Sequence, residues 1–428
     1  MTLFVSTMRK ICVVTTNRAD YGRLHPIMDA LCKRGDIELQ VVVGSAVYFH
    51  SLWKFFTYAR PANLWRSLPW YLRARLIGLF GGDRGIAMRD HLSRAILADG
   101  FTIAAHVPLM LEGGTLDIMP KTAGLGLLDL PDIFEKLAPD LVLINGDRFE
   151  IMPVAVAAAF MNIRIAHVEG GDVSGTIDNS IRHAVSKLSH LHFPATKESA
   201  ERLRRMGEDP ATIYTFGSPI IDSLKGIDTN LDDSIFDRYP SDVGRIDLSK
   251  PYALVIQHPV TTEYADNYRQ TTELLAALKD SGLQLFFVAP NIDAGSDGVT
   301  EALREFRATA DQTKVVFHKH MSLEDYTKLL AHATVAVGNS SSLIREAAYL
   351  GTPVVLAGTR QQHRERGENV LEVPADRKAI AHAIEIQRTH GRYATDLRFG
   401  DGTAVPRIAE VLATIDLAQV PVQKYFYE

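Results

Sequence analysis

Four carboxylates follow two neighbouring apolar runs in the first half of the chain. Asp147 comes directly after LVLING, Glu169 ends NIRIAHVE, and Asp172 and Asp178 lie shortly beyond it. Carboxylates gathered at one cleft suit proton abstraction and return, because their proximity separates their pKa values. Helix capping by Asp178 and turn closure by Asp172 are the structural alternatives. Capping does not account for Asp147 and Glu169 at the ends of consecutive expected strands.

The second half of the chain places an imidazole, hydroxyls and a guanidinium after similar apolar runs. His258 follows YALVIQ, and Arg360 follows TPVVLAGT. Ser340 and Ser341 lie in GNSSS, directly before the helical pattern LIREAAYL, where free backbone N–H groups and the helix dipole favour a phosphate. Glu346, one turn into that pattern, is placed to accept hydrogen bonds from ribose hydroxyls. Ordinary serine capping and a structural histidine are the alternatives.

A further arginine follows the first apolar run of the chain. Arg18 lies in the loop NRADYG after KICVVTT, where its guanidinium could hold a phosphate with two hydrogen bonds. A surface arginine is the alternative for Arg18 taken alone. Together, Arg18, Arg360, the GNSSS segment and Glu346 indicate a nucleoside diphosphate ligand.

Other ligand signals are weak or missing in the sequence. The pairs His190–His192 and His318–His320 alternate on expected strands, but no third and fourth metal ligands are evident nearby. The chain has no GxxxxGKS/T motif and no GxGxxG motif after its first expected strand. ATP hydrolysis and dinucleotide redox chemistry therefore lack their usual signals. We expect neither a metal ion nor a cofactor.

The elements that must position these residues alternate between strands and helices. Short, β-branched apolar runs predict buried parallel strands, and helical patterns such as 149–161 and 180–189 lie between them. The expected strands are 10–16, 37–44, 141–146, 162–169, 212–217, 252–259, 283–290, 314–320, 334–340 and 352–358. A polar, aspartate-rich stretch at about 218–250 separates the two series. We predict an α/β protein of two doubly wound, Rossmann-like parallel sheets facing a cleft, with ligands outside the carboxyl ends of the strands.

The composition of the chain argues against several classes of protein. The 428 residues carry 46 Lys+Arg and 51 Asp+Glu, a formal charge of −5, which argues against a general nucleic-acid binder. The two cysteines exclude a disulfide framework. No apolar stretch reaches the roughly 18 residues that a membrane-spanning helix needs. The N-terminus lacks the charged-then-apolar order of a signal peptide, so we expect a cytoplasmic protein.

Residues 48–87 do not fit the alternation of strands and helices. This segment holds all three Trp and is rich in other aromatic and basic residues, with Asp83 as its single acid. Such a segment can lie on a membrane surface or on a partner. We favour an insertion whose helices pack on their own domain or across an oligomer interface, because amphipathic segments usually face a protein core.

These motifs closely resemble those of the hydrolysing UDP-N-acetylglucosamine 2-epimerases of sialic acid synthesis. The nearest likeness is to the epimerase half of the bifunctional animal epimerase/kinase. The matching stretches are NRADYGRLHPIM, GDRFE, MNIRIAHVEGGDVSGTIDNSIRHAVSKL, QHPVTT, NIDAGS, VGNSSSLIRE, GTPVVLAGTRQ, GENVL and GDGTAVPRI. The resemblance therefore extends over both halves of the chain.

The resemblance implies a GT-B-type fold and a division of the chain into domains. It predicts an N-terminal domain at 1–218, with 48–87 as an insertion, and a UDP-binding domain at 219–399. The final segment, 400–428, is expected to form a helix that crosses back to the N-terminal domain. Because the family is usually dimeric or tetrameric, a homodimer or homotetramer is expected.

The resemblance also implies a reaction and its residues. Once the C2 proton of UDP-N-acetylglucosamine is removed, UDP leaves, and the 2-acetamidoglycal is hydrated to N-acetylmannosamine. The family's catalytic carboxylates match Asp147 and Asp178, expected to transfer protons in the elimination, and Glu169, expected to activate water. Its substrate contacts match Arg18, Arg148, His183, His258, Asn291, Ser340, Ser341, Glu346 and Arg360.

Two alternatives remain open on the sequence. Bacterial relatives act on UDP- or GDP-linked 2,4-diacetamido-trideoxy sugars in legionaminic acid synthesis, and the residues that distinguish that substrate are not identified by the sequence. A non-catalytic nucleotide-sugar sensor or scaffold would tolerate the loss of the three carboxylates, yet all three are present.

Overall fold

The computed structural model describes residues 8–47, 91–111, 115–239, 244–291, 293–319 and 321–428, without the side chains of residues 18, 19, 45–47 and 110. The segment 48–87 therefore lies outside the described residues, and its expected packing stays a prediction. Among the described residues, no helix is long and apolar enough to cross a membrane.

The first half of the chain forms a six-stranded parallel sheet in the order β3-β2-β1-β4-β5-β6. Its strands are β1 (Arg9–Thr15), β2 (Ile37–Val47), β3 (Ile103–Leu111), β4 (Leu141–Asn145), β5 (Arg164–Val168) and β6 (Leu191–Phe193). Its helices are α1 (Arg18–Cys32), α5 (His91–Ala98), α6 (Ile118–Leu137), α7 (Ile151–Phe160), α8 (Ile177–Leu188) and α9 (Lys197–Arg205). The central strands are buried on both faces, as their unbroken apolar runs predict.

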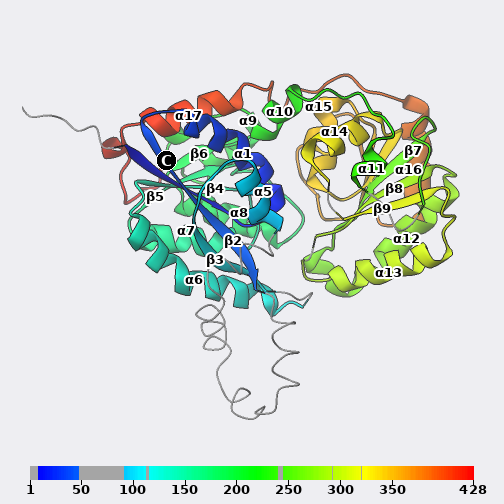
Figure 1. Ribbon diagram of the computed structural model, residues 1–428, viewed down its shortest axis with the longest axis horizontal. Coiled ribbons are helices and arrows are strands. Elements are labelled where there is room, and N and C mark those ends of the chain that lie inside the picture. Colours follow the sequence, from blue (N-terminus) through cyan, green and yellow to red (C-terminus); the bar gives the residue numbers. More distant parts are fainter. Residues whose placement is uncertain (1–7, 48–90, 112–114, 240–243, 292, 320) are drawn as a thin grey trace, which may run out of the picture.

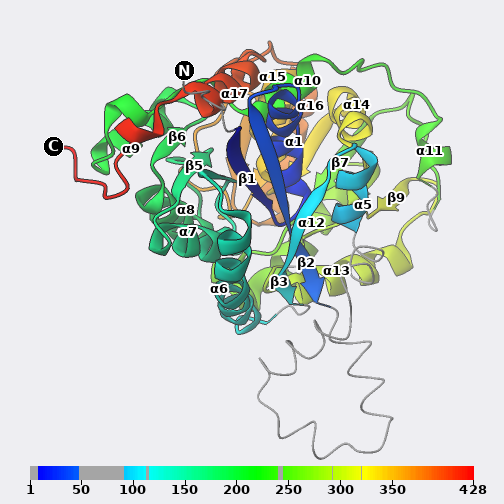
Figure 2. The same ribbon diagram turned by 60° about the vertical axis from the view of Figure 1, so that its left-hand side comes forward.

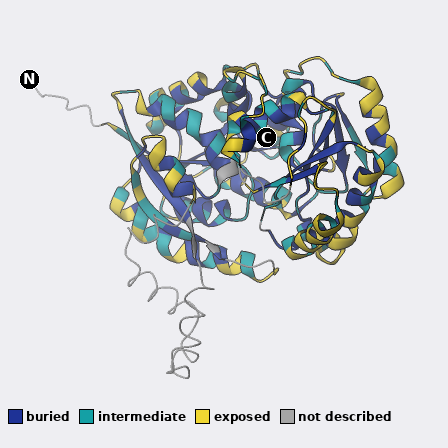
Figure 3. Cartoon of the chain, turned by 45° about the vertical axis from the view of Figure 1, so that its right-hand side comes forward, coloured by how far each residue is buried: buried dark blue, intermediate teal, exposed yellow. Residues whose placement is uncertain are grey.

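The second half forms another six-stranded parallel sheet, in the order β12-β11-β10-β7-β8-β9. Its strands are β7 (Tyr252–Ile256), β8 (Gln284–Val288), β9 (Val315–His318), β10 (Val335–Gly338), β11 (Val354–Ala357) and β12 (Val370–Val373). The α-helices after α9 are α10 (Pro219–Lys225), α11 (Ile235–Arg238), α12 (Asn267–Asp280), α13 (Ser296–Thr309), α14 (Leu323–His332), α15 (Arg345–Leu350), α16 (Arg377–His390) and α17 (Ala404–Thr414). In Figure 3 the strands form the dark blue, buried centre of each half, and exposed residues gather on the outer helices.

The two sheets have the same topology, which determines where a ligand would bind. In each sheet, three strands that are consecutive in the chain follow one another from the centre to one edge, and the other three follow one another from the centre to the opposite edge. The order reverses between β1 and β4 in the first sheet, and between β7 and β10 in the second. Ligands of doubly wound sheets bind beyond the carboxyl ends of the strands at such a reversal. The prediction of two doubly wound parallel sheets is confirmed.

Several strand predictions need correction. The stretch 212–217 is not a strand, because only Ile213 pairs, through a single bridge to His192. Its aromatic residues pack instead, with Tyr214 stacked on Phe193 and the Arg407 guanidinium 4.0 Å from the Phe216 ring centre. Strands β3 and β12 were not among those predicted, and β6 was anticipated only through the alternation of its histidines. The sixth position of the first sheet thus belongs to a strand of three residues.

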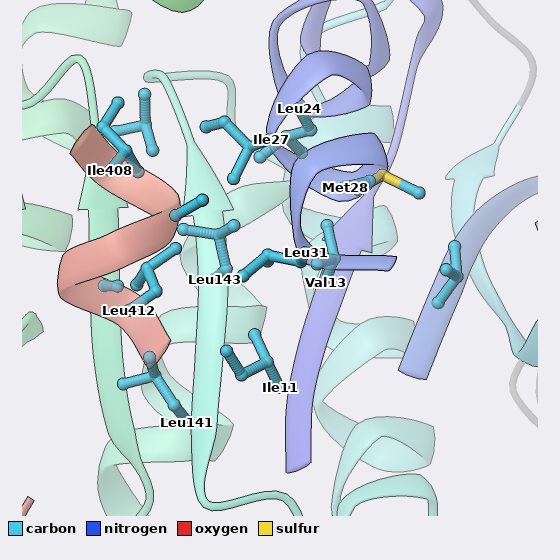
Figure 4. Packing of buried hydrophobic residues seen from close by; sticks show 14 of the residues in the cluster. Ile11, Val13, Leu24, Ile27, Met28, Leu31, Leu141, Leu143, Ile408 and Leu412 are labelled. Atoms are coloured by element: carbon cyan, nitrogen blue, oxygen red, sulfur yellow. The ribbon is translucent and has the colours of Figure 1, made fainter. Parts of the chain in front are cut away.

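The last helix, α17, completes the core of the first half rather than the second. Ile408 and Leu412 are fully buried against Leu141 and Leu143 of β4, beside the α1 side chains (Figure 4). Figure 1 shows α17 above the first sheet, although the chain reaches it directly from the second. The opposite face of that sheet packs under α6, α7 and α8.

The residues after α17 stay with the first half. Figure 2 shows them passing beside β6 and α9. Lys424 donates hydrogen bonds to the carbonyl oxygens of Ser186 (3.3 Å) and Lys187 (2.9 Å), near the end of α8, and forms an ion pair with Glu208. The division into 1–218, 219–399 and 400–428 stays a prediction.

Candidate active site

The loops after the strands of the two sheets touch each other directly. The backbone N–H of Gly175, before α8, donates a hydrogen bond to the carbonyl oxygen of Arg360, after β11 (2.9 Å). A Cβ atom at position 175 would collide with the carbonyl oxygen of Thr359, so only glycine allows this approach. The two edges that carry the predicted residues are therefore in contact.

Glu169 lies where the two sheets meet, at the end of β5. Its backbone is left-handed, with φ of 61°, which is uncommon for a residue other than glycine. Its carboxylate accepts hydrogen bonds from Arg345 of α15 (2.6 Å) and from the Ser218 hydroxyl (2.5 Å), and Arg23 of α1 lies at 3.1 Å. Burial opposes ionisation, but Arg345 and Arg23 together lower the pKa of Glu169 to about 2. Glu169 is therefore an ionised carboxylate between the two halves.

Asp178 has the opposite electrostatic setting. It lies in the first turn of α8, whose N-cap is Thr176, so the alternative that Asp178 caps this helix does not hold. Burial raises the pKa of Asp178, and the nearby Arg360 guanidinium offsets part of that effect. Asp178 thus keeps a proton to higher pH than an ordinary aspartate, as a group that both gives and takes protons requires.

Asp147 follows β4 and forms an ion pair with Arg182 of α8. The side chain of Arg182 is 1% exposed, and that of Asp147 is 25% exposed. Asp172, the fourth carboxylate, accepts the backbone N–H of the next residue, Val173 (2.8 Å), a contact too local to close a turn. Asp172 also forms an ion pair with Arg364, which follows β11 of the second sheet. The contacts of Asp172 therefore do not support the alternative that it closes a turn, and its ion pair joins it to the second sheet.

Arg148 connects the predicted residues of the first sheet to those of the second. Its guanidinium donates two hydrogen bonds to Asp293 (2.5 and 3.0 Å) and two to the buried Glu150 (2.9 and 3.2 Å). Burial opposes ionisation of Asp293, but the Arg148 guanidinium lowers its pKa overall. Asn291 donates from its side chain to the Asp293 carboxylate (2.5 Å). Arg148 and Asn291 therefore share one acidic partner.

His258, in the loop directly after β7, has a defined tautomer. Its Nδ1 accepts the backbone N–H of Asn291 (3.1 Å), so the proton of the neutral ring lies on Nε2. Burial and the Arg360 charge lower the pKa of His258 to about 3. Asn339 holds the His258 backbone with two hydrogen bonds, of 2.7 and 2.8 Å, and its carbonyl accepts from Arg360 (3.1 Å).

The GNSSS segment differs from the predicted helix start. After β10 the chain makes a single 3-10 turn, Ser341–Leu343, before the six-residue α15 begins at Arg345. Ser340 is the N-cap of that turn and accepts the Ser342 N–H (3.4 Å). Glu346 is buried, and within the described part of the chain its Oε2 makes no hydrogen bond. The serines thus lie on a tight turn rather than on the first turn of an α-helix.

Two predicted residues remain outside these contacts. His183 follows Arg182 on α8, and its Nδ1 is buried without a hydrogen-bond partner among the described residues. Burial, and then the Arg182 charge, lower the pKa of His183. Arg18 begins α1, but its side chain lies outside the described residues.

Sequence reasoning missed the arginines that join the two halves. Arg345 and Arg364 are buried and pair with Glu169 and Asp172 of the first sheet. The signal was present, because Arg345 stands in a helix whose other residues are mostly apolar, where an arginine needs a buried partner. Asp293, the partner of Arg148, was likewise read only as part of NIDAGS.

Two further features concern ligands. No three His, Cys, Asp or Glu side chains of the described residues lie close enough together to hold a metal ion, and His320 is outside that set. A cavity of about 650 Å³ opens at the carboxyl ends of β11 and β12. Of the predicted site residues that the structure describes, none lines that cavity.

Comparison with known proteins gives one family over most of the chain. Residues 85–413 match the family described as UDP-N-acetylglucosamine 2-epimerase. The chain is 33% identical over 410 residues to the hydrolysing UDP-N,N'-diacetylbacillosamine 2-epimerase of Legionella pneumophila, covering 96% of this chain and 97% of that protein. It is 28% identical over 424 residues to the UDP-N-acetylglucosamine 2-epimerase of Neisseria meningitidis serogroup B, covering 98% and 99%.

Solved structures of the same fold are also found. The UDP-N-acetylglucosamine 2-epimerase of Methanocaldococcus jannaschii, in complex with UDP-N-acetylglucosamine and UDP, superposes with a TM-score of 0.69 at 17% identity, covering 94% of this chain and 99% of that chain. At this identity the likeness concerns the fold alone, and it confirms the expected GT-B-type arrangement of two Rossmann-like sheets.

Proposed function

Because the chain belongs to the UDP-N-acetylglucosamine 2-epimerase family, we propose that it is a hydrolysing 2-epimerase that converts UDP-N-acetylglucosamine and water to N-acetylmannosamine and UDP. One observation carries the proposal: Glu169, directly after β5, and Asp178, in the first turn of the next helix, α8, have pKa values shifted in opposite directions. Such a divergence separates an ionised carboxylate from one able to exchange a proton.

The elimination needs a base at C2 and stabilisation of the leaving diphosphate. A carboxylate takes the C2 proton, the C1–O bond to UDP breaks with both electrons going to the oxygen, and a C1–C2 double bond forms. We assign proton transfer in this step to Asp147 and Asp178. Asp178 is suited to it by its raised pKa. Positive charge and N–H donors stabilise the departing diphosphate, which is the role that we assign to Arg360 and the turn at Ser340 and Ser341.

Hydration of the 2-acetamidoglycal completes the reaction. Water adds its oxygen to C1, and C2 regains a proton on the opposite face, which inverts that carbon. We assign the activation of water to Glu169, whose ionised carboxylate accepts hydrogen bonds from Arg345 and Ser218 and has further lone pairs to accept a proton. The neutral His258 offers an Nε2–H donor, and Glu346 offers an acceptor for a ribose hydroxyl. Arg18, Arg148, His183 and Asn291 are proposed substrate contacts.

Proton NMR in deuterated water tests the proposal directly. With UDP-N-acetylglucosamine we expect UDP together with N-acetylmannosamine that carries deuterium at C2. Epimerised but uncleaved UDP-sugar, or product with hydrogen retained at C2, would contradict the hydrolysing elimination route.

A second substrate is favoured by a specific observation. The relative at 33% identity is the hydrolysing UDP-N,N'-diacetylbacillosamine 2-epimerase, against 28% for the N-acetylglucosamine enzyme. The second candidate function is therefore the same reaction on a UDP- or GDP-linked 2,4-diacetamido-trideoxy sugar. Ratios of kcat/KM for these substrates decide between the candidates. The expected cytoplasmic location and homo-oligomeric state stay predictions.

A further inference from the structure

We propose that Arg182 is a positioning residue that fixes the carboxylate of Asp147, and that Arg364 of the second half secures it through Asp172. This inference rests on the proposed function, because it concerns the geometry of one of its proton-transfer groups. Arg182 was not among the residues predicted to bind substrate or to perform chemistry.

The position of Arg182 suits this role. It lies four residues after Asp178 on α8, so both residues are on the same face of that helix. Its side chain is among the largest that are fully buried, and its guanidinium pairs with Asp147. Asp147 is itself a quarter exposed. Arg182 therefore holds the carboxylate from the buried side and leaves another side open to a ligand.

Other hydrogen bonds fix the guanidinium in place. Nη1 of Arg182 donates to the carbonyl oxygen of Asp172 (2.9 Å), and Nη2 lies 3.4 Å from the Ser174 hydroxyl. Because the guanidinium is planar and rigid, anchoring one nitrogen sets the direction of the others. A lysine at this position could keep the charge but would present a single ammonium group to all these acceptors.

The second half of the molecule reaches this anchor through Asp172. The Asp172 carboxylate pairs with Arg364, which is buried and also donates to the Gln361 side chain (2.9 Å). The connection therefore runs from Arg364, through Asp172 and Arg182, to Asp147. When the two sheets are together, the Asp172 backbone is held where Arg182 needs it. The geometry couples the contact between the halves to the orientation of Asp147.

Steady-state kinetics of R182Q, R182K and R364Q test this coupling, with R202Q as a matched control. Arg202 also donates to a carbonyl of this loop, that of Gly171, but it forms its ion pair with Glu198. For R182Q we expect kcat to fall about 100-fold, the effect of misplacing a reacting group by about 1 Å. KM should stay close to that of the wild type. R182K should lose less activity than R182Q, R364Q should lose about tenfold, and R202Q should behave as the wild type.

A crystal structure of R182Q with UDP gives a readout that does not depend on turnover. We expect the Asp147 carboxylate to leave its present position while the fold is retained. An undisplaced Asp147, an unchanged kcat, or a rise in KM that accounts for the whole loss would each overturn the inference. If R182Q does not fold, R182K and R364Q provide the same kinetic comparison. Failure of the proposed function is distinguishable, because the wild type would then show no turnover while the displacement in R182Q would persist.

Discussion

The two sheets share one strand order but carry different chemistry where that order reverses. The loops after β4 and β5 bring the carboxylates Asp147 and Glu169, whereas those after β7 and β10 bring His258 and the serines that follow Asn339. In parallel sheets this edge collects the side chains that contact ligands, whatever those side chains are. The topology thus fixes the place, and the residues after each strand decide which reaction or ligand that place supports.

The difference between the two edges indicates how proton transfer and diphosphate binding can be assigned to opposite sides of one cleft. An acidic edge suits proton transfer, and an edge of N–H donors, hydroxyls and a guanidinium suits a diphosphate. Salt bridges such as Glu169–Arg345 and Arg148–Asp293 join the two edges, so neither is electrostatically independent of the other. If the division is real, substitutions on the first edge affect turnover, and substitutions on the second affect binding.

The largest expected effect is that of D178N on turnover. Removing a group that transfers protons should lower kcat about 1000-fold, while UDP affinity stays within about threefold of the wild type. UDP release gives kcat, and calorimetry gives the affinity. The control is D132N, on the exposed surface of α6. Equal losses of kcat and UDP affinity would break the proposed division between the edges.

The second largest expected effect is a loss of stability in the variant E169Q. Leaving Arg345 and Arg23 without their buried partner should lower the free energy of unfolding by about 3 kcal/mol at neutral pH. The pKa of Glu169 lies at about 2 in the folded protein, below its ordinary 4.5. Its contribution is therefore complete above pH 4.5 and is lost as the pH falls toward 2.

Denaturant unfolding of both proteins at several pH values checks this expectation. The difference in unfolding free energy between wild type and E169Q should stay constant from neutral pH down to about 4.5, and it should shrink as the pH is lowered further toward 3. A difference that is independent of pH would mean that Glu169 is not held as an ionised carboxylate by the arginines of the two halves.

On the second edge, R360Q should weaken UDP binding. Loss of a charge-assisted hydrogen bond to a phosphate costs about 2 kcal/mol, or about 30-fold in Kd. We expect kcat at saturating substrate to fall much less than in D178N. Calorimetry with UDP measures the change, and R377Q, whose arginine pairs with Asp280 on the surface, is the control. Unaltered affinity would remove Arg360 from the proposed diphosphate contacts.

The smallest effect concerns pH. Because the pKa of His258 is about 3, the imidazole stays neutral at all pH values near neutrality. The affinity of D178N for UDP-N-acetylglucosamine, whose diphosphate has no proton to lose in this range, should change less than about twofold between pH 5.5 and 7.5. A strong rise in affinity toward pH 5.5 would show that His258 binds as an imidazolium.

The sequence predicted those parts of the fold that depend on local pattern. Strands β1, β4, β7 and β10 are continuous β-branched apolar runs, and they were predicted with errors of a few residues at their ends. The stretch 212–217, TIYTFG, is also rich in β-branched and aromatic residues, but it packs its aromatic rings against Phe193 and α17. The composition of a segment indicates that it is buried, but not whether its backbone pairs with a neighbouring strand.

The sequence could predict which residues belong to the candidate site, but it could not predict which of them contact one another. Position after a strand pointed to Asp147, Glu169 and His258. No local pattern states that Arg345 reaches Glu169, because the two are separated by 176 residues and meet only when both sheets are formed. The pKa directions follow from such contacts, so they too were beyond the sequence.

The packing of α17 has a consequence for how the protein is made. Ile408 and Leu412 belong to the core of the first sheet, yet they are translated after every strand of the second. A growing chain therefore emerges from the ribosome with α1 already available to cover part of that face, but with the area that α17 covers still exposed. The usual order, in which an N-terminal domain is finished before the next begins, does not apply here. We expect the two halves to reach their native state together, at the end of synthesis, with chaperones shielding that apolar face until α17 arrives.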